Sequence, residues 1–401
     1  MDLDVTPRHQ THDYRTMNGV QRSHLDKEGQ MERVYLHRDH QAEWIATMHG
    51  NRTPDGVITA HEDPRLISTS LADRLSTEAQ QAATLCDAAT LAHGGGDRPQ
   101  PEEPDHYRTC FERDRDRILH SSAFRRLAGK TQVFIFPADH QRTRLTHALE
   151  VAQVGSAIAR RLRLNVDLTE AIALGHDCGH GPGGHASEVA LEPFLSEGFD
   201  HAPWGAFVTL APLNLCVETT DGIANHSWSR PRPITPEAEI VALADRIAYS
   251  AHDLEDAIGA GLLAREAIPT DLTSLIGSHR NRQLDYFITD VIETTIAAGT
   301  IGLSLEAGEA LAALRSFNYT HIYTTDASEA QSRAVISLLR SLTEYLIDHP
   351  ASLPQREEET SIERQVVAYV AGMTDRFAFQ LAHELLDWPV DRLPMGIDLR
   401  G

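Results

Sequence analysis

Residues 171–188, AIALGHDCGHGPGGHASE, place histidine and acidic residues at close intervals behind a short apolar run. The run follows an Asp-x-x-Glu pattern at 167–170, which is typical of the capping box at a helix N-terminus. We therefore predict a helix that ends near the dipeptide His176–Asp177. The glycines that follow predict a tight turn, which gathers three further polar side chains at the same point, His180, His185 and Glu188.

The dipeptide His176–Asp177 could bind a metal ion only together with residues from other helices, because adjacent side chains on a helix point about 100° apart. The sequence offers two such residues. His147 lies early in the helix that we expect over 146–162, and Asp245 lies midway along the helix that we expect over 236–258. Asp245 interrupts an apolar stripe, where a buried carboxylate usually has a cation as its partner.

Two imidazoles and two carboxylates would form a mixed nitrogen and oxygen site. Such a site suits divalent Mn, Fe, Co, Ni or Zn better than Mg or Ca, and an ion there would act as a Lewis acid towards a phosphate. A single His-Asp dipeptide is weak evidence, since His252–Asp253 is a second one in this chain. The prediction therefore rests on four residues together, His147, His176, Asp177 and Asp245.

Gly179, Gly181 and Gly184 also spell the GxGxxG pattern of dinucleotide-binding proteins. That pattern requires a strand before the glycines and an acidic residue about 20 residues after them. The sequence predicts neither, so we exclude a dinucleotide site and interpret these glycines as a turn.

Helical periodicity dominates the chain from residue 106 onward, whereas the alternation typical of strands is limited to a possible hairpin at 132–136. Neither βαβ alternation nor a repeat of about 20–50 residues is visible. We therefore predict an all-α fold. The apolar spacing predicts helices over 114–127, 146–162, 167 onward, 236–258, 305–317, 327–347 and 361–386.

Residues 1–105 are polar, rich in histidine and weakly periodic, with one helix predicted over 70–91. The stretch HGGGDRPQPEEP at 93–104 has the composition of a linker or exposed loop. We therefore expect a boundary near residue 105, between an N-terminal extension over 1–105 and a helical domain over 106–401.

The chain of 401 residues carries 36 Lys and Arg against 58 Asp and Glu, a net charge of −22. This balance argues against general nucleic-acid binding, which needs clustered cations. Five basic residues nevertheless gather in one short window, Arg125, Arg126, Lys130, Arg142 and Arg144. Because this run abuts His147, we favour a substrate pocket over a solvated basic surface.

The cysteine pattern and the apolar stretches indicate a cytoplasmic protein. The four cysteines include no CxxC pair, which favours a reducing compartment over a disulfide scaffold. The first residues lack the apolar core of a signal peptide. The longest uncharged apolar stretch, 202–217, is too short to span a membrane and contains Pro203 and Pro212. We expect no membrane association.

The order and spacing of the four metal-ligand candidates resemble the HD superfamily of metal-dependent phosphohydrolases, whose fold is a helical bundle with the metal site at its centre. Longer stretches are similar to its deoxyguanosine triphosphate triphosphohydrolase-like branch, and the resemblance covers roughly 106–380. These stretches are RDRDRILHSSAFRRLAGKTQVF (113–134), RTRLTHALEVAQVGSAIARRL (142–162), AIALGHDCGHGPGGHASE (171–188), ALADRIAYSAHDLEDAI (242–258) and YVAGMTDRFA (369–378).

The resemblance implies hydrolysis of a deoxynucleoside triphosphate to deoxynucleoside and inorganic triphosphate, by attack of water on the α-phosphorus. It implies a divalent metal ion, with Mg also possible, and a homo-oligomer that nucleotides often regulate at subunit interfaces. Single-stranded DNA binding is known in this branch, but the net charge of −22 argues against it here.

The resemblance also assigns roles by motif position. It places the metal on His147, His176, Asp177 and Asp245, and it makes His185 and Glu188 the acid/base pair. It implies that the remaining positions bind substrate: His180, His201 and Arg144 at the phosphates, Tyr249 and Asp253 at the sugar, and Lys130 near the nucleotide.

The segment HAPWGA at 201–206 departs from the branch, which has an asparagine after the histidine and then a Gln-Ser pair. We expect that Trp204 brings an indole near the phosphates or the base. A second hypothesis therefore keeps the fold and the metal but has another substrate, a monophosphate or a nucleotide of specialised metabolism. The release of tripolyphosphate would separate the two.

Two hypotheses of other classes remain open. The first is a regulatory protein that binds nucleotides without turnover, against which the intact pair His185 and Glu188 speaks. The second is a di-iron oxygenase on the same scaffold, in which His180 and His201 would supply ligands for a second iron.

Overall fold

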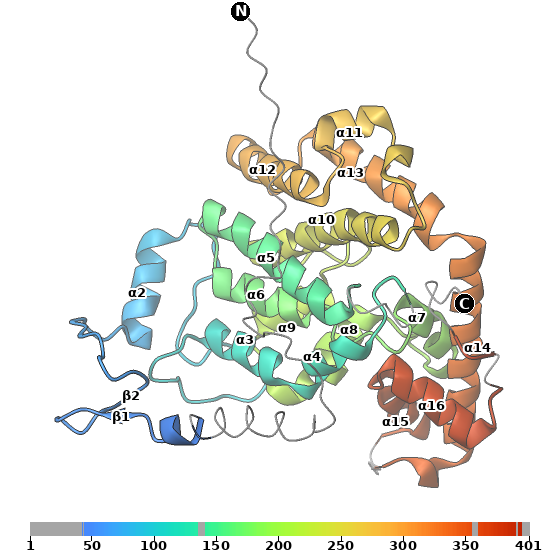
Figure 1. Cartoon of the computed structure of the whole chain (residues 1–401), viewed down its shortest axis with the longest axis horizontal. Coiled ribbons are helices and arrows are strands. Elements are labelled where there is room, and N and C mark those ends of the chain that lie inside the picture. The colour runs from blue at the N-terminus through green and yellow to red at the C-terminus, as the bar shows by residue number, and fades with distance from the viewer. Residues whose placement is uncertain (1–41, 43, 135–140, 355–359, 390–391, 395–401) are drawn as a thin grey trace, which may run out of the picture. The chain divides into compact units, whose positions relative to one another are not determined.

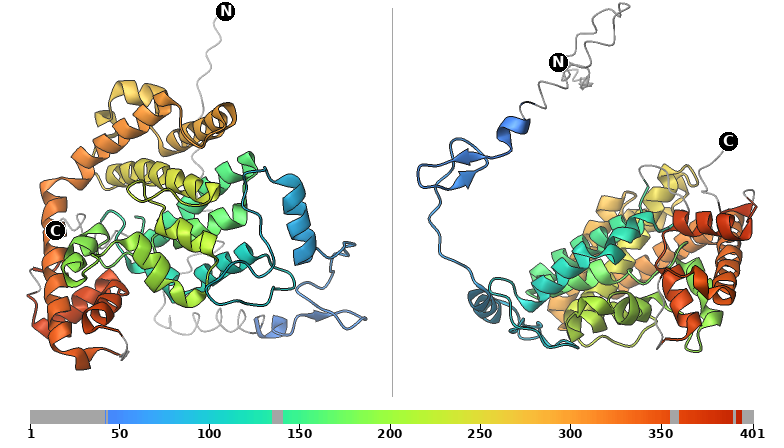
Figure 2. Two further views of the ribbon diagram at one scale, coloured as in Figure 1. Left: turned by 180° about the vertical axis from the view of Figure 1, so that it is seen from behind. Right: turned by 90° about the horizontal axis from the view of Figure 1, so that it is seen from below.

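The computed structural model describes residues 42, 44–134, 141–354, 360–389 and 392–394, and the chain separates into two units, Met1–Leu71 and Ala72–Gly401. The prediction of an all-α fold is confirmed, since regular structure in the described residues is helical apart from one two-stranded sheet (Figures 1 and 2). The helices are α2 (Arg74–Thr84), α3 (Cys110–His120), α4 (Ser122–Arg126), α5 (Arg144–Leu162), α6 (Val166–Gly175), α7 (His185–Leu191), α8 (His201–Trp204), α9 (Val217–Ala224), α10 (Pro236–Gly259), α11 (Thr270–Ile276), α12 (Arg280–Ala298), α13 (Leu305–Asn318), α14 (Asp326–Asp348), α15 (Ile362–Ala371) and α16 (Asp375–Leu386).

Short 3₁₀ and π turns link several of these helices. The π turns are η4 (Gly205–Thr209) and η7 (Tyr319–Tyr323), and the 3₁₀ turns are η2 (Leu127–Gly129), η3 (Glu192–Phe194), η5 (Ala211–Leu213), η6 (Arg265–Ala267) and η8 (Pro350–Ser352). None of the described helices is long and apolar enough to cross a bilayer.

The first unit contains a small antiparallel hairpin. Its strands are β1 (Asn51–Arg52) and β2 (Ile58–Thr59), with Asn51 opposite Thr59. None of the described residues of this unit is buried, and Leu66 is almost fully exposed. The described residues therefore form no hydrophobic core in this unit.

Several helix boundaries differ from the predicted ones because capping side chains divide the apolar pattern. Ser121 is extended and accepts a hydrogen bond from Phe124 N, so the helix expected over 114–127 is two helices, α3 and α4. Thr374 caps α16 in the same way and separates it from α15. Asn165, rather than Asp167, caps α6. Short polar side chains hydrogen-bond the backbone locally and so compete with a continuous helix.

The hairpin expected at 132–136 runs into residues 135–140, which lie outside the described residues. Before them, one isolated antiparallel bridge joins Thr131 to Thr143. The helix expected over 70–91 is the shorter α2.

The second unit has two large hydrophobic cores and one small cluster formed by Phe134, Ala257 and Ile322. The larger core joins α3, α5, α6, α9, α10, α12 and α13, and the smaller one joins α7 to α14, α15 and α16. On α10, the buried residues Ile240, Ala244, Ile247, Ala251 and Leu254 recur every three or four positions, which turns one face into the larger core. Figure 1 shows α14 along one side of the unit, with α15 and α16 packed against it.

The segment before α3 belongs to the second unit, so the division of the chain lies earlier than the expected boundary near residue 105. Arg98, within the expected linker, is fully buried and pairs with Asp114 of α3 at 2.6 Å. Asp114 also accepts hydrogen bonds from Cys216 N and from the Thr219 hydroxyl. This ion pair therefore joins the segment to α3 and α9.

Replacement of Arg98 by methionine is expected to lower the free energy of unfolding by about 3–5 kcal/mol, because it leaves the buried carboxylate of Asp114 without its cation. Urea denaturation followed by circular dichroism measures this change. Arg108→Met is the matched control, since Arg108 pairs with Asp105 and Asp116 at the surface, and such pairs contribute less than about 1 kcal/mol. Equal losses in the two variants would contradict the structural role of Arg98.

Candidate active site

A cavity of about 530 Å³ lies between α5 and α10 on one side and the run from α13 to α14 on the other. Its size is that of a small-molecule site. The turn after α6 and the segment 226–228 complete its wall. The helices that carry the lining residues pack in both hydrophobic cores, α5, α10 and α13 in the larger one and α7 and α14 in the smaller one, so packing on either side sets their positions.

The four predicted metal ligands lie together, and three of them, His147, Asp177 and Asp245, line this cavity. His147 comes from the first turn of α5, His176 and Asp177 from the end of α6, and Asp245 from the middle of α10. His147 Nε2 lies 3.0 Å from Asp245 Oδ1 and 3.9 Å from Asp177 Oδ2. His176 Nε2 lies 3.4 Å from Asp177 Oδ1 and 3.7 Å from Asp245 Oδ1.

The hydrogen bonding of His176 shows that this group fits a cation. His176 Nδ1 donates to Ala173 O at 2.7 Å, so Nε2 carries the lone pair. Among the described residues, this buried Nε2 has no hydrogen-bond partner, and it faces two carboxylate oxygens. The lone pair of His176 Nε2 therefore points at two carboxylate oxygens, and a positive charge among these three atoms would offset their mutual repulsion.

Both carboxylates of this group are ionised. Burial raises the pKa of Asp177, but the neighbouring His176 and Arg144 more than offset it and hold the pKa well below its usual value. Burial also raises the pKa of Asp245, but the hydrogen bond with His147 and the neighbouring imidazoles of His176 and His226 together outweigh it and lower the pKa to about 2.

Arg144 begins α5 and holds the second oxygen of Asp177. Its Nη1 donates to Asp177 Oδ2 at 2.6 Å, and both side chains are buried. Gly184 lies against the guanidinium with φ +63°, and a Cβ there would sit 2.7 Å from Arg144 Nη2. A glycine is therefore required at this point of the turn, both for its φ and for the space.

Glu188 of α7 holds two histidines. His185 Nδ1 donates to Glu188 Oε2 at 3.0 Å, and His201 donates to Oε1 from Nδ1 at 2.5 Å and from its backbone N–H at 3.1 Å. His185 is 73% exposed and lines the cavity, whereas His201 is buried.

The protonation of this trio follows from its contacts. Burial raises the pKa of Glu188, but the hydrogen bonds from His185 and His201 lower it further than burial raises it. Burial lowers the pKa of His201, but Glu188 raises it above its usual value. The carboxylate is therefore ionised, and it stabilises a protonated imidazole.

His180 and His201 stack on each other, with ring centroids 3.7 Å apart and planes 14° apart. Together with His185 and Glu188 they lie close enough to surround one ion. In stacked rings, however, the nitrogen lone pairs point along parallel planes and do not converge. Glu188 is also occupied by two imidazole donors, so the geometry favours acid/base chemistry over a second iron site.

Tyr249 and Asp253, one and two turns after Asp245, also line the cavity. Asp253 accepts hydrogen bonds from Arg142 and from the Tyr323 hydroxyl. Arg142 is buried and also contacts two further carboxylates, Glu150 at 3.0 Å and Asp256 at 2.8 Å. Arg142 therefore fixes α10 against the start of α5.

The basic run is not one pocket. Arg125 is exposed, Arg126 is half-buried, and only Arg144 of the five lines the cavity. Lys130 is buried behind the cavity wall, where its ammonium donates to His180 O and to Ala371 O. Burial lowers the pKa of Lys130 to about 7.

We infer that Lys130 holds the turn after α6 rather than the nucleotide. Lys130→Met would leave two buried carbonyl oxygens without donors, at about 1–3 kcal/mol each. We expect a thermal midpoint several degrees lower and a KM for nucleotide that changes less than twofold, as measured by calorimetry and steady-state kinetics. An unchanged midpoint with a strongly raised KM would instead support direct contact with substrate.

Asp375 ties the same turn to α16. It accepts hydrogen bonds from Thr131 N and Gly183 N, each at 2.9 Å, and from the Thr131 hydroxyl. Gly183 has φ +74° and packs against Val335 of α14. Helix α16 therefore supports the turn after α6.

Trp204 does not enter the cavity, contrary to our expectation. Its ring packs against Phe199, with centroids 5.0 Å apart, within the smaller core. Of the segment 201–206, only His201 lines the cavity. The backbone of this segment packs directly on Gly179. A Cβ on Gly179 would lie 2.0 Å from His201 O and 2.4 Å from Gly205 N.

Sequence reasoning missed several residues of the cavity. His226 is buried, donates from Nδ1 to Ile223 O, and lies with Nε2 3.3 Å from His201 Nε2. Gln132 lines the cavity and has a buried Oε1 without a hydrogen-bond partner in the described part of the chain. Neither His226 nor Gln132 belongs to a sequence motif that would have identified it as a site residue. Other missed residues that line the cavity include Trp228, Arg246, Arg315 and Tyr323.

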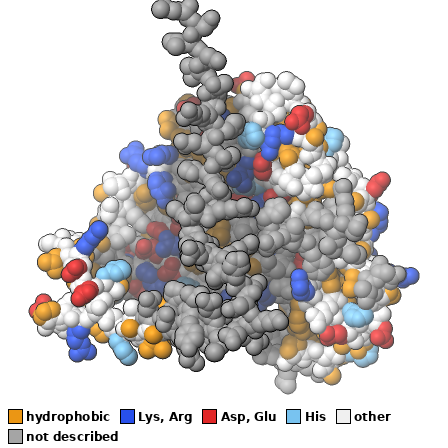
Figure 3. Space-filling model, in the orientation of Figure 1, with side chains coloured by type: hydrophobic (Ala, Val, Ile, Leu, Met, Phe, Trp, Pro, Cys, Tyr) orange, Lys and Arg blue, Asp and Glu red, His pale blue; other side chains and the backbone are white. Residues whose placement is uncertain are grey.

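The positive charge for an anionic ligand lies inside the molecule. On the described part of the face in Figure 3, basic side chains stand in small groups among acidic and apolar ones. By contrast, three arginines from three different helices, Arg144, Arg246 and Arg315, line the same cavity. This arrangement reconciles a net charge of −22 with an anionic substrate.

The comparisons with known proteins agree with this geometry. The sequence model of the HD domain matches residues 144–250, which contain all four predicted ligands, and that of the phosphohydrolase-associated domain matches 301–384. These matches define an HD-domain phosphohydrolase. A deoxyguanosinetriphosphate triphosphohydrolase-like protein of Caldanaerobacter subterraneus subsp. tengcongensis is 41% identical over 313 residues, which cover 75% of this chain and 92% of that protein.

A protein of Clostridium perfringens (strain SM101 / Type A) with the same name is 40% identical over 299 residues, which cover 70% of this chain and 87% of that protein. The chain belongs to this deoxyguanosinetriphosphate triphosphohydrolase-like family of HD-domain proteins.

Proposed function

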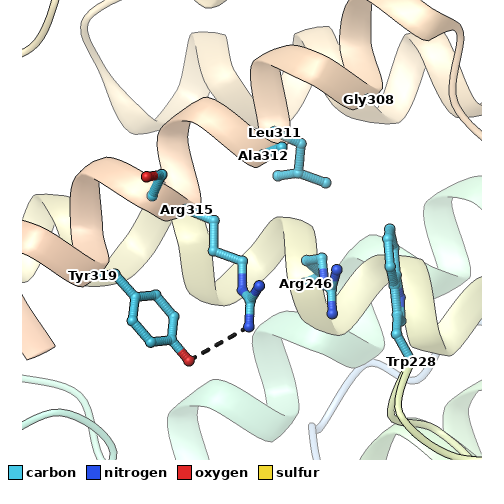
Figure 4. A pocket seen from close by; sticks show the side chains of 8 residues that line it. Trp228, Arg246, Gly308, Leu311, Ala312, Arg315 and Tyr319 are labelled. Atoms are coloured by element: carbon cyan, nitrogen blue, oxygen red, sulfur yellow. Dashed lines mark hydrogen bonds between the residues drawn. The ribbon is translucent and has the colours of Figure 1, made fainter.

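We propose that the protein hydrolyses deoxynucleoside triphosphates to deoxynucleoside and inorganic triphosphate. The observation that carries this proposal is the set of groups that share one cavity. The HD group, which we define as His147, His176, Asp177 and Asp245, and the two histidines held by Glu188 share it with the guanidiniums of Arg246 and Arg315, which Figure 4 shows. In the described residues, no carboxylate forms an ion pair with either guanidinium, which suits them to the β- and γ-phosphates.

The residues of the HD group would hold a divalent ion, which supplies Lewis-acid polarisation of a phosphoryl oxygen. Arg144 lies beside the same carboxylate and would contact the α-phosphate. Water forms the new bond to the α-phosphorus, and the bond from phosphorus to O5′ breaks. His185 is oriented through Nδ1 by Glu188, so its Nε2 is available to give a proton to O5′.

The sugar would lie against Tyr249 and Asp253. Tyr323 and Arg142 fix the Asp253 carboxylate from two directions, which orients it for the 3′-hydroxyl. The unpartnered Oε1 of Gln132 is a second acceptor in the cavity. The names of the relatives make dGTP the first nucleotide to test.

A product assay tests the proposal. Protein reconstituted with Mn is incubated with each dNTP, NTP and dNMP, and the products are resolved by chromatography and phosphorus NMR. We expect deoxynucleoside and tripolyphosphate in equal amounts. Release of orthophosphate from a monophosphate would contradict the proposal and support the second hypothesis, a different nucleotide substrate. The altered segment 201–206 gives that hypothesis less support than expected, because Trp204 packs in the smaller core.

A further inference from the structure

Trp228 lies where the active-site cavity opens into an adjoining pocket of about 470 Å³. The pocket is walled by α13 and by the guanidiniums of Arg246 and Arg315 (Figure 4). The sequence motifs do not mark Trp228, and the steps of the proposed reaction leave it without a role. Its indole is about half exposed.

Trp228 contacts helix α10 at two points, the side chain of Arg246 and the backbone of Ala242. Arg246 Cζ lies 3.5 Å from the centre of the indole ring, so the guanidinium is stacked on the face of the ring. The indole Nε1–H donates to Ala242 O at 2.9 Å. Ala242 precedes Arg246 by one turn of α10, so the indole is anchored to the helix that carries the guanidinium.

The choice of partner matters for the charge. A carboxylate would fix Arg246 but would also neutralise it. An indole face holds a guanidinium by cation–π attraction and leaves its N–H edge free for a planar or tetrahedral anion. Arg315, on α13, lines both cavities together with Arg246, and its side-chain partners in the described residues are hydroxyls rather than carboxylates, those of Tyr319, at 3.5 Å, and Tyr249. Two like charges in one pocket favour an anion with several negative oxygens.

The position of Arg246 relates this pocket to the metal group. Arg246 follows Asp245 directly, so its side chain leaves the helix about 100° away from that of the metal ligand. Both guanidiniums line the same cavity as Asp177 and Asp245, so Arg246 and Arg315 are available to a phosphate chain whose first phosphorus lies at the HD group.

We propose that Trp228 is a positioning residue that presents Arg246, together with Arg315, to the terminal phosphate of the substrate, and that this device selects nucleotides by the number of their phosphates. The inference rests on the proposed function, because it assigns the phosphate chain to this end of the cavity. It makes Trp228 a determinant of triphosphate over diphosphate and monophosphate.

A double-mutant cycle tests whether Trp228 acts through Arg246. Trp228→Leu and Arg246→Ala are each expected to raise the KM for dGTP about tenfold while kcat stays within twofold. The double variant is expected to be no worse than Arg246→Ala alone, because the two residues form one unit. Trp228→Phe keeps an aromatic face and should restore most of the affinity. Trp388→Leu, far along the chain in the smaller core, is the control for loss of an indole.

A binding measurement separates this inference from the proposed reaction. Calorimetry with Mn-loaded protein and the Mn complex of inorganic tripolyphosphate needs no turnover. Binding that weakens about tenfold in Trp228→Leu supports the inference, even if no deoxynucleoside triphosphate is hydrolysed. Wild-type affinity in Trp228→Leu, no binding to the wild-type protein, or strictly additive effects in the cycle would each overturn it.

Discussion

Asp177→Ala is expected to remove the bound metal and to abolish hydrolysis. Asp177 contacts three other side chains of the site. Its Oδ1 lies 3.4 Å from His176 Nε2 and 3.3 Å from His180 Nε2, and its Oδ2 accepts a hydrogen bond from Arg144. The loss of a partner that only supports a metal ligand costs about 10–100-fold in affinity. The loss of a direct ligand should therefore cost more than about 100-fold.

Metal content after dialysis, measured by plasma mass spectrometry, and turnover of dGTP check this prediction. Because Asp177→Ala also strands the buried guanidinium of Arg144, Asp177→Asn is measured beside it, with circular dichroism to confirm folding. Asp167→Ala is the matched control, since Asp167 stands at the opposite end of the same helix and pairs with Arg115. Full metal occupancy in both Asp177 variants would show that the ligand set is wrong.

The ligand group could be predicted because each of its residues occupies a place that helical spacing already defines. His147 begins one helix, His176 and Asp177 end another, and Asp245 breaks an apolar stripe on a third. Helices that bury such stripes against one another must bring those positions together. The fold class and most helix ranges follow from the same periodicity.

The directions of the side chains around the ligand group could not be predicted in this way. Lys130 stands one residue from Thr131, which lines the cavity, yet its ammonium turns behind the wall. A shift of one residue reverses a side chain in extended backbone, and spacing alone does not set its direction. Trp204 was also misplaced, because its indole packs against Phe199 in the smaller core, a contact that the spacing of residues 201–206 does not reveal.

Arg246 and Arg315 illustrate a different limit. They are separated by most of α10, α11, α12 and α13, and each looks like an ordinary surface arginine in sequence. Only the packing of α13 over α10 places them in one pocket, without carboxylate partners among the described residues. Charge that is left unpaired in a fold is a signal of function that a sequence does not display.

Glu188→Gln is expected to keep the metal and lose turnover by about 10²–10⁴-fold, the usual contribution of a positioned acid/base group. Glu188 accepts hydrogen bonds from His185 and His201 on its two oxygens. A glutamine has one acceptor oxygen, so one imidazole would face an N–H group and would lose both its orientation and its stabilised proton. The metal-ligand candidates belong to other elements than Glu188, so this substitution leaves all four in place. They are His147, His176, Asp177 and Asp245.

Glu188→Gln should be compared with Asp177→Ala, because the first variant is expected to keep the metal and the second to lose it. The pair therefore separates metal binding from proton transfer. Glu192→Gln, an exposed glutamate at the end of the same helix, is the control and should retain both metal and turnover. If Glu188→Gln lost its metal as Asp177→Ala does, then Glu188 would be a ligand, and the stacked pair His180 and His201 would have to open around an ion. If it kept metal and full turnover, neither His185 nor His201 could depend on this carboxylate for its proton, and the acid would have to lie elsewhere in the cavity.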